Sequence, residues 1–337
     1  MSEAFLDLIL AFTIIIACAK LGGYISIRLG QPSVLGELLV GVILGPTILD
    51  MFGNFPLFHE ETHVKETVTE FAELGVLLLM MLAGLELHIS ELIKSGKVAG
   101  FAGTLGVFVP VLMGYGTGLF FGLESNEAIF VGLALSATSV SISAQTLMEL
   151  NVLRSRVGLA LLGAAVFDDI LVILLLSIAS IFASGGSGEG GSVIVTIVRM
   201  VGYLIGAAVL GYYLIPRLAV WVNKLRIFQG LVAFALVILL LYAWSAEVIG
   251  GMAGITGAFI VGLLLAQTPF VNDIEQGITA MAYGFFVPIF FVNIGLSVNL
   301  GAISGSDWIF AIILTLVAIL SKIIGCGFGG RLGGLGN

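Results

Sequence analysis

Long apolar runs separated by short polar segments dominate the pattern of this 337-residue chain. Each run has about 20 residues, the length a helix needs to cross a hydrocarbon layer of about 30 Å. Lipid offers the backbone no hydrogen-bond partners, so the runs are expected to be helices. About eleven spans are predicted, near residues 5–27, 33–50, 70–89, 98–121, 127–149, 156–183, 193–216, 227–246, 250–268, 278–298 and 307–330.

Composition excludes a water-soluble domain. Hydrophobic residues make up 59% of the chain and charged residues only 10%, against about 25% charged in soluble domains. The 46 glycines lie mostly inside the apolar runs and predict close helix packing. No basic patch favours nucleic-acid binding. Neither a nucleophile–base pair nor a metal-ligand spacing indicates an enzyme or a bound cofactor, so none is expected.

Positive residues gather at alternate ends of the predicted spans. They are Arg28, Lys94, Lys97, Arg154, Arg156, Arg217, Lys224, Arg226 and Arg331. Lys and Arg favour cytoplasmic loops. The pattern therefore predicts a multi-pass protein of the cell (inner) membrane with its amino terminus outside.

One part of the sequence resembles another. Val34–Leu44 matches Ile255–Leu265, both with a Gly-x4-Gly spacing, and Gly84 corresponds to Gly295 in the spans that follow. The two copies run through the predicted membrane in opposite directions. Inverted repeats are typical of secondary transporters, whose substrate site lies near the midplane between the copies.

Two adjacent acids, Asp168 and Asp169, lie inside the apolar run 156–183. A charge at this depth costs a few kcal/mol, so the pair predicts a functional site. A structural role, with each acid neutralised by a buried partner, is the alternative. A carboxylate that holds either a proton or a monovalent cation couples two fluxes, because the two ligands exclude each other.

A third intramembrane charge, Lys322, lies near the middle of the last predicted span. Snorkelling to an interface is the alternative for a membrane lysine. We expect Lys322 to pair with Asp168, which leaves Asp169 for the transported monovalent cation.

The span before the acids is rich in hydroxyl side chains. A break in the helix at Ala137, Thr138 and Ser139 is predicted to supply carbonyl and hydroxyl groups to the ion site. Hydroxyls that bond the backbone one turn back and only pack the helices are the alternative. Lower-ranked polar candidates are Asn293, Glu73 and Glu86.

Four segments carry motifs that are specific in combination: Gln31–Pro46, Leu82–Glu86, Phe167–Asp169 and Pro288–Leu296. Together they resemble the monovalent cation:proton antiporter-2 family, which includes bacterial sodium/proton antiporters and the related Kef potassium-efflux proteins. The resemblance extends over the whole chain. It implies an all-helical fold of thirteen spans with crossed discontinuous helices, a dimerisation half, and a core half that moves.

The resemblance also implies site roles. The position of Asp169 carries the ion, and the position of Asp168 pairs with a lysine at the position of Lys322 in electrogenic sodium exchangers. Exchange of Na⁺ for protons by alternating access is therefore predicted, in a homodimer. A potassium/proton antiporter of the Kef type, and a cation channel or sensor without proton coupling, are the alternatives.

Residues 1–337 are expected to form a single antiporter domain. Dimerisation spans are expected near 5–50 and 193–268, and core spans near 70–183 and 278–337. About two more spans are expected beyond residue 337, because a repeat architecture requires them. The fold is therefore expected to be truncated at its C-terminal side.

Overall fold

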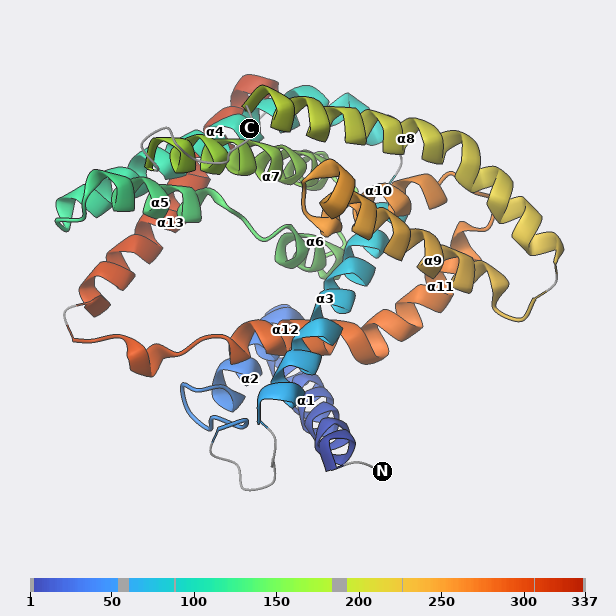
Figure 1. Ribbon diagram of the computed structural model, residues 1–337, viewed down its shortest axis with the longest axis horizontal. Coiled ribbons are helices and arrows are strands. Elements are labelled where there is room, and N and C mark those ends of the chain that lie inside the picture. Colours follow the sequence, from blue (N-terminus) through green and yellow to red (C-terminus); the bar gives the residue numbers. More distant parts are fainter. Residues whose placement is uncertain are drawn as a thin grey trace.

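The computed structural model describes residues 3–53, 61–87, 89–183, 193–225, 227–305 and 307–335, and within these ranges the secondary structure is entirely helical (Figure 1). The α-helices are α1 Glu3–Arg28, α2 Ser33–Leu44, α3 Glu61–Leu85, α4 Ile89–Phe120, α5 Ser125–Ser136, α6 Val140–Glu149, α7 Arg156–Ala183, α8 Val193–Lys224, α9 Gly230–Ser245, α10 Gly254–Leu265, α11 Val271–Met281, α12 Val287–Leu296 and α13 Asp307–Gly333. Short π-helical turns, η1 Ala246–Gly250 and η2 Ala282–Phe286, follow α9 and α11, and a 3-10 turn, η3 Leu300–Ala302, follows α12.

The helices agree with the predicted spans. In the described part of the chain, nine helical segments are long and apolar enough to cross a membrane, and α2 and α10 are shorter apolar helices. These eleven segments match the eleven predicted runs in order. The span predicted at 278–298 begins earlier in the structure, at Val271. Helices α11 and α12 form one continuous segment with the π-helical turn η2 between them, and this turn ends just before Pro288. Proline removes a backbone donor, which favours an irregular turn at that point.

Two groups of helices pack together more closely within each group than across it. In one group, α4 packs extensively against α5, α7 and α13, while in the other α3 packs on α10 and α12, and α2 packs on α1 and α12 (Figure 1). The expected core included spans 70–89 and 278–298. In the structure these spans, which are α3 and α12, pack with α1, α2 and α10, and the division into dimerisation and core halves stays a prediction. Which group moves during transport stays a prediction.

Close glycine contacts explain this grouping and follow the predicted repeat. A methyl group added at Gly41 of α2 would lie 2.8 Å from Gly295 Cα of α12. A methyl group added at Gly262 of α10 would likewise lie 2.8 Å from Gly84 Cα of α3. Gly41 and Gly262 are equivalent in the repeat, as are Gly84 and Gly295. Each copy therefore packs its first helix on the second helix of the other, which is the exchange that a pseudo-two-fold axis requires.

Candidate functional site

The span predicted at 127–149 is broken where the sequence predicts it. Helix α5 ends at Ser136, α6 begins at Val140, and Ala137 and Ser139 have extended backbone conformations. The Ser139 hydroxyl caps α6 by accepting from the Ile142 backbone N–H. Serine and threonine favour such local bonds over a continuous helix. The break therefore leaves carbonyl groups at the end of α5 without helical partners.

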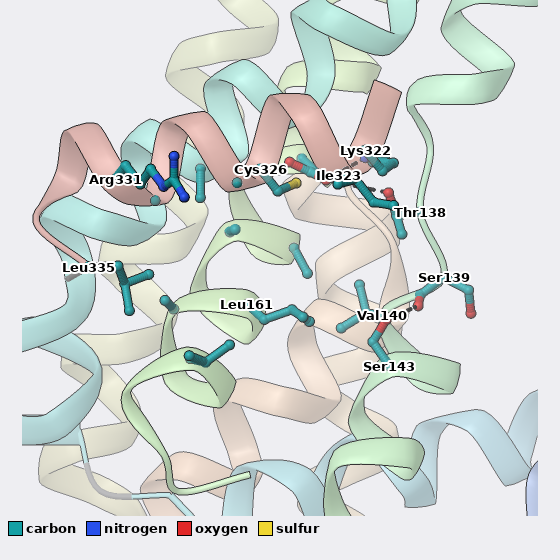
Figure 2. A pocket seen from close by; sticks show the side chains of 18 residues that line it. Thr138, Ser139, Val140, Ser143, Leu161, Lys322, Ile323, Cys326, Arg331 and Leu335 are labelled. Carbon is teal, nitrogen blue, oxygen red and sulfur yellow. Dashed lines mark hydrogen bonds and ion pairs between the residues drawn. The ribbon is translucent and has the colours of Figure 1, made fainter. Parts of the chain in front are cut away.

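Lys322 of α13 meets this break and the first acid together. Its ammonium Nζ lies 3.0 Å from Asp168 Oδ2 and donates to the Ser136 carbonyl oxygen at 2.8 Å. The Thr138 hydroxyl lies at 3.5 Å from the same Asp168 oxygen (Figure 2). The carbonyl end of a helix attracts cations. The lysine charge is therefore shared between a carboxylate and the C-terminal end of α5.

Glycines bring the helices of this site close enough for that contact. Gly325, Gly329 and Gly333 recur at intervals of four along α13, and a methyl group on any of them would overlap atoms of α4. On α4, a methyl group at Gly103 would come within 3.3 Å of Asp168 Oδ1. Small residues at such spacing let membrane helices approach closely. Asp168 is consequently buried, at 5% exposure.

A cavity of about 720 Å³ adjoins the ion pair. Its polar lining includes Asp168 and, labelled in Figure 2, Thr138, Ser139, Ser143, Lys322 and Arg331. The other Asp168 oxygen, Oδ1, is buried and has no hydrogen-bond partner among the residues that the structure describes. A buried oxygen in this state is costly, and it can accept a proton or a further donor.

Asp169 lies on a different side of α7, since adjacent helical residues point about 100° apart. It is half-buried and forms no hydrogen bond or ion pair with any residue in the described ranges. Within those ranges no group of three or more His, Cys, Asp or Glu side chains could hold a resident metal ion. A transported cation would be cargo rather than a resident metal ion.

The lower-ranked candidates lie outside this cavity. Asn293 of α12 accepts from the Thr69 hydroxyl of α3 at 3.4 Å, and Glu73 is an exposed residue of α3. Glu86 follows the end of α3, beyond the span. Burial raises the pKa of the Glu86 carboxyl above its usual range; repulsion from Glu275 adds to the rise, and Arg154 opposes it.

Sequence reasoning missed two polar contacts inside the helix packing. Glu37 of α2 is buried at 5% exposure and lies 3.7 Å from Lys20 of α1. Glu149, the last residue of α6, binds Ser33 at the start of α2. Lys20 and Glu37 lie on neighbouring apolar helices, and that proximity was a usable signal. Glu149 gave none, because its partner lies 116 residues away.

A repeat of apolar helices with a discontinuous span and a buried lysine–carboxylate pair defines the class of this protein. It is a multi-pass membrane protein with the fold of a secondary antiporter.

Comparisons with known proteins agree with that class. The model of the family described as sodium/hydrogen exchanger, transmembrane, matches residues 13–337. The chain is 39% identical to the Na⁺/H⁺–K⁺ antiporter GerN of Bacillus cereus, over 95% of this chain and 79% of that protein. It is 38% identical to a Na⁺/H⁺ antiporter of Enterococcus hirae, over 93% and 78%. The chain therefore belongs to the sodium/hydrogen exchanger family.

A solved structure shows the same fold. The sodium proton antiporter MjNhaP1 of Methanocaldococcus jannaschii superposes with a TM-score of 0.71, covering 100% of this chain and 80% of that one at 18% identity. The narrower assignment to the cation:proton antiporter-2 family is not shown by these matches and stays a prediction.

Proposed function

We propose that this protein exchanges Na⁺ for protons across a membrane by alternating access. The observation that carries the proposal is the buried Asp168–Lys322 pair beside the break between α5 and α6, at 3.0 Å, in a chain of the sodium/hydrogen exchanger family. Relatives named as Na⁺/H⁺ antiporters support sodium as the cation. One of them, GerN, is also named for K⁺, so potassium is the second candidate.

The proposed roles follow from the surroundings of each residue. Asp169 is the cation and proton acceptor, because no described side chain neutralises it. Lys322 neutralises Asp168, and the position of this pair along α7 and α13 fixes how deep in the membrane the ion-binding site lies. The break at Ala137, Thr138 and Ser139 supplies further oxygen atoms. Cation and proton compete for one carboxylate, and that competition couples the fluxes.

The remaining proposals concern the protein in its membrane. The trio of two carboxylates and one ammonium favours electrogenic exchange, in which a membrane potential contributes about 2.3 kcal/mol per charge per 100 mV. We also propose a homodimer in the cell (inner) membrane. The proposed orientation has the amino terminus outside, because Arg28, Arg154 and Arg217 fall at alternate ends of the spans along the sequence. Membership of the cation:proton antiporter-2 family is part of the same proposal.

The test uses the full-length protein in proteoliposomes with an imposed pH gradient. Addition of Na⁺, K⁺ or Li⁺ in parallel should collapse the gradient with Na⁺ most effective. A gradient that persists with all three cations contradicts exchange. Cation flux without proton counterflow would identify a channel or sensor instead, and a preference for K⁺ would identify a potassium/proton antiporter of the Kef type.

A further inference from the structure

The carboxylate of Glu149, at the end of α6, lies at the start of α2. The Ser33 backbone N–H donates to Glu149 Oε2 at 2.6 Å, and the Ser33 hydroxyl donates to Oε1 at 2.5 Å. Helix α2 has no side-chain cap of its own and no acid in its first turn. The start of a helix attracts negative charge and needs acceptors for its free N–H groups. Glu149 supplies both from a distant segment.

A second contact extends this link. The Gln145 side chain, one turn earlier on α6, donates through Nε2 to Glu149 Oε1 at 2.8 Å. The Tyr283 hydroxyl of η2 donates to Gln145 Oε1, also at 2.8 Å. One continuous chain of hydrogen bonds therefore joins α6 to α2 and to η2. Gln145 is buried at 5% exposure, and leaving such a network half made is costly.

The boundary between α6 and α2, which this network crosses, has a cavity beside it. A cavity of about 710 Å³ lies beside it, between α6 on one side and the ends of α1, α3 and α11 on the other. Its polar lining includes Ser33, Glu86, Gln145, Glu149 and Tyr283. Val34 of α2 and Ala144 of α6 belong to one buried apolar cluster, and the hydrogen bonds add a directional attachment at the polar end of that packing.

The equivalent place in the second repeat copy is built differently. Gly254 begins α10 and corresponds to Ser33, and its backbone N–H donates to Glu247 Oε1 at 3.3 Å. Glu247 belongs to η1, only seven residues earlier in the chain. Glu247 and α10 therefore lie next to each other in the chain and pack together as one local unit. Glu149, by contrast, reaches α2 from the half of the broken span that contacts the Asp168 site.

We propose that Glu149 is a positioning residue for exchange. Its contact with Ser33 holds α6, and with it the break at residues 137–139, in one of the arrangements that alternating access uses. The contact must open when α6 moves past α2. The inference rests on the proposed function, since a contact of this kind matters to flux only if the protein alternates.

Cross-linking tests the requirement for opening. In a background without cysteines, where Cys18→Ala and Cys326→Ala are among the changes, the pair Ser33→Cys and Glu149→Cys is bridged with a short bis-thiosulfonate reagent in proteoliposomes. Each variant is compared with itself before bridging. We expect bridging to lower Na⁺-driven proton flux at least about 10-fold, because a conformational step then limits turnover, and a reductant to restore the flux.

The matched control is the pair Glu247→Cys and Gly254→Cys at the equivalent helix start. The methyl group of a residue at 254 would contact mainly the Glu247 side chain, which the variant removes. Bridging this pair should leave the flux unchanged. Full flux after bridging the Ser33→Cys/Glu149→Cys pair would overturn the inference. Equal inhibition by this bridge and by the control bridge would overturn it as well.

A second measurement does not depend on transport. Glu149→Gln should speed hydrogen exchange of the Ser33 amide in detergent, and Glu149→Asp should speed it less, because only the carboxylate caps α2 with full charge. An unchanged exchange rate would refute the contact itself. Absence of Na⁺-driven flux in the unmodified protein would refute the proposed function and leave this amide measurement to decide on the contact.

Discussion

Asp168 and Asp169 are neighbours in α7, yet their surroundings are opposite. Asp168 is buried, 3.0 Å from Lys322 Nζ and 3.5 Å from the Thr138 hydroxyl. Asp169 is half-buried and has no hydrogen-bond or ion-pair partner in the described ranges. One residue of helix rotation, about 100°, is enough to separate the two environments. The first acid is paired with an ammonium group of the protein, and under the proposed function the second is the acid that takes a cation from solution.

The charges explain why a transporter would keep both acids. Two carboxylates and one ammonium carry a net charge of −1 when all are ionised. One monovalent cation or one proton neutralises that charge. A second positive ion would leave the site with a net charge of +1, so it would be held less well. Lys322 therefore reduces the cost of burying the two acids, and under the proposed function the remaining negative charge binds one positive ion.

The largest expected effect comes from the acid without a partner. Asp169→Asn should lower Na⁺/H⁺ exchange by about 100-fold or more, since the loss of a charged ligand costs about 3 kcal/mol. Proton flux driven by Na⁺ in proteoliposomes measures this. Asp169→Glu, which keeps the charge, is the control. Exchange retained by the asparagine variant would show that the two acids have been assigned the wrong way round.

The second effect concerns the paired acid. Lys322→Met should destabilise the protein by about 3 kcal/mol, because it leaves a buried carboxylate without its partner. The double variant Asp168→Asn/Lys322→Met should recover part of that loss, which a thermal unfolding series in detergent measures. Simple additivity of the two substitutions would contradict a coupled pair.

The dependence of exchange on membrane potential is expected to distinguish the two acids further. Asp168→Asn should retain some exchange but lose part of its dependence on membrane potential, because the variant changes the charge that moves with the site. Flux at clamped diffusion potentials measures this dependence. A variant with full voltage sensitivity would remove the role given to Asp168 and Lys322.

A smaller effect is expected at the break. Thr138→Val keeps the shape of the side chain but removes the hydroxyl near Asp168. The apparent KM for Na⁺ should rise by about 3- to 10-fold, the equivalent of one modest hydrogen bond. Thr138→Ser, which keeps the hydroxyl, should stay close to the native value. An equal rise in both variants would assign the effect to packing rather than to the oxygen atom.

The sequence predicts the helices well, because the length of each apolar run reports membrane depth directly. It also predicts the break at 137–139, where hydroxyl side chains compete with the helix backbone. Asp168 and Lys322 stand out for the same reason, since charges inside long apolar runs are rare. These signals are local, so one sequence is enough to find them.

Lateral neighbours are not predicted in the same way. Apolar periodicity does not say which helices touch, so the placement of α3 and α12 with α2 and α10 emerged only from contacts such as Gly41 with Gly295. The contact of Glu149 with Ser33 joins residues 116 positions apart. An acid at the end of a span has the same pattern whether it faces water or caps another helix.

The smallest expected effect tests whether any partly buried acid would behave like Asp169. Glu86 lies beyond the end of α3, and burial together with repulsion from Glu275 raises its carboxyl pKa. The folded protein therefore keeps this proton to a higher pH than the unfolded chain. Native stability should fall as the pH rises from the unfolded to the folded pKa.

Glu86→Gln removes that titration. The variant should match the native Tm at low pH and exceed it at higher pH, by less than about 2 °C because Glu86 is only partly buried. Thermal unfolding at several pH values measures the difference, and exchange should remain close to native. A loss of exchange comparable to that of Asp169→Asn would mean that acids at the edge of the bundle take part in ion binding. The contrast between the two neighbouring acids of α7 would then not be enough to locate the site.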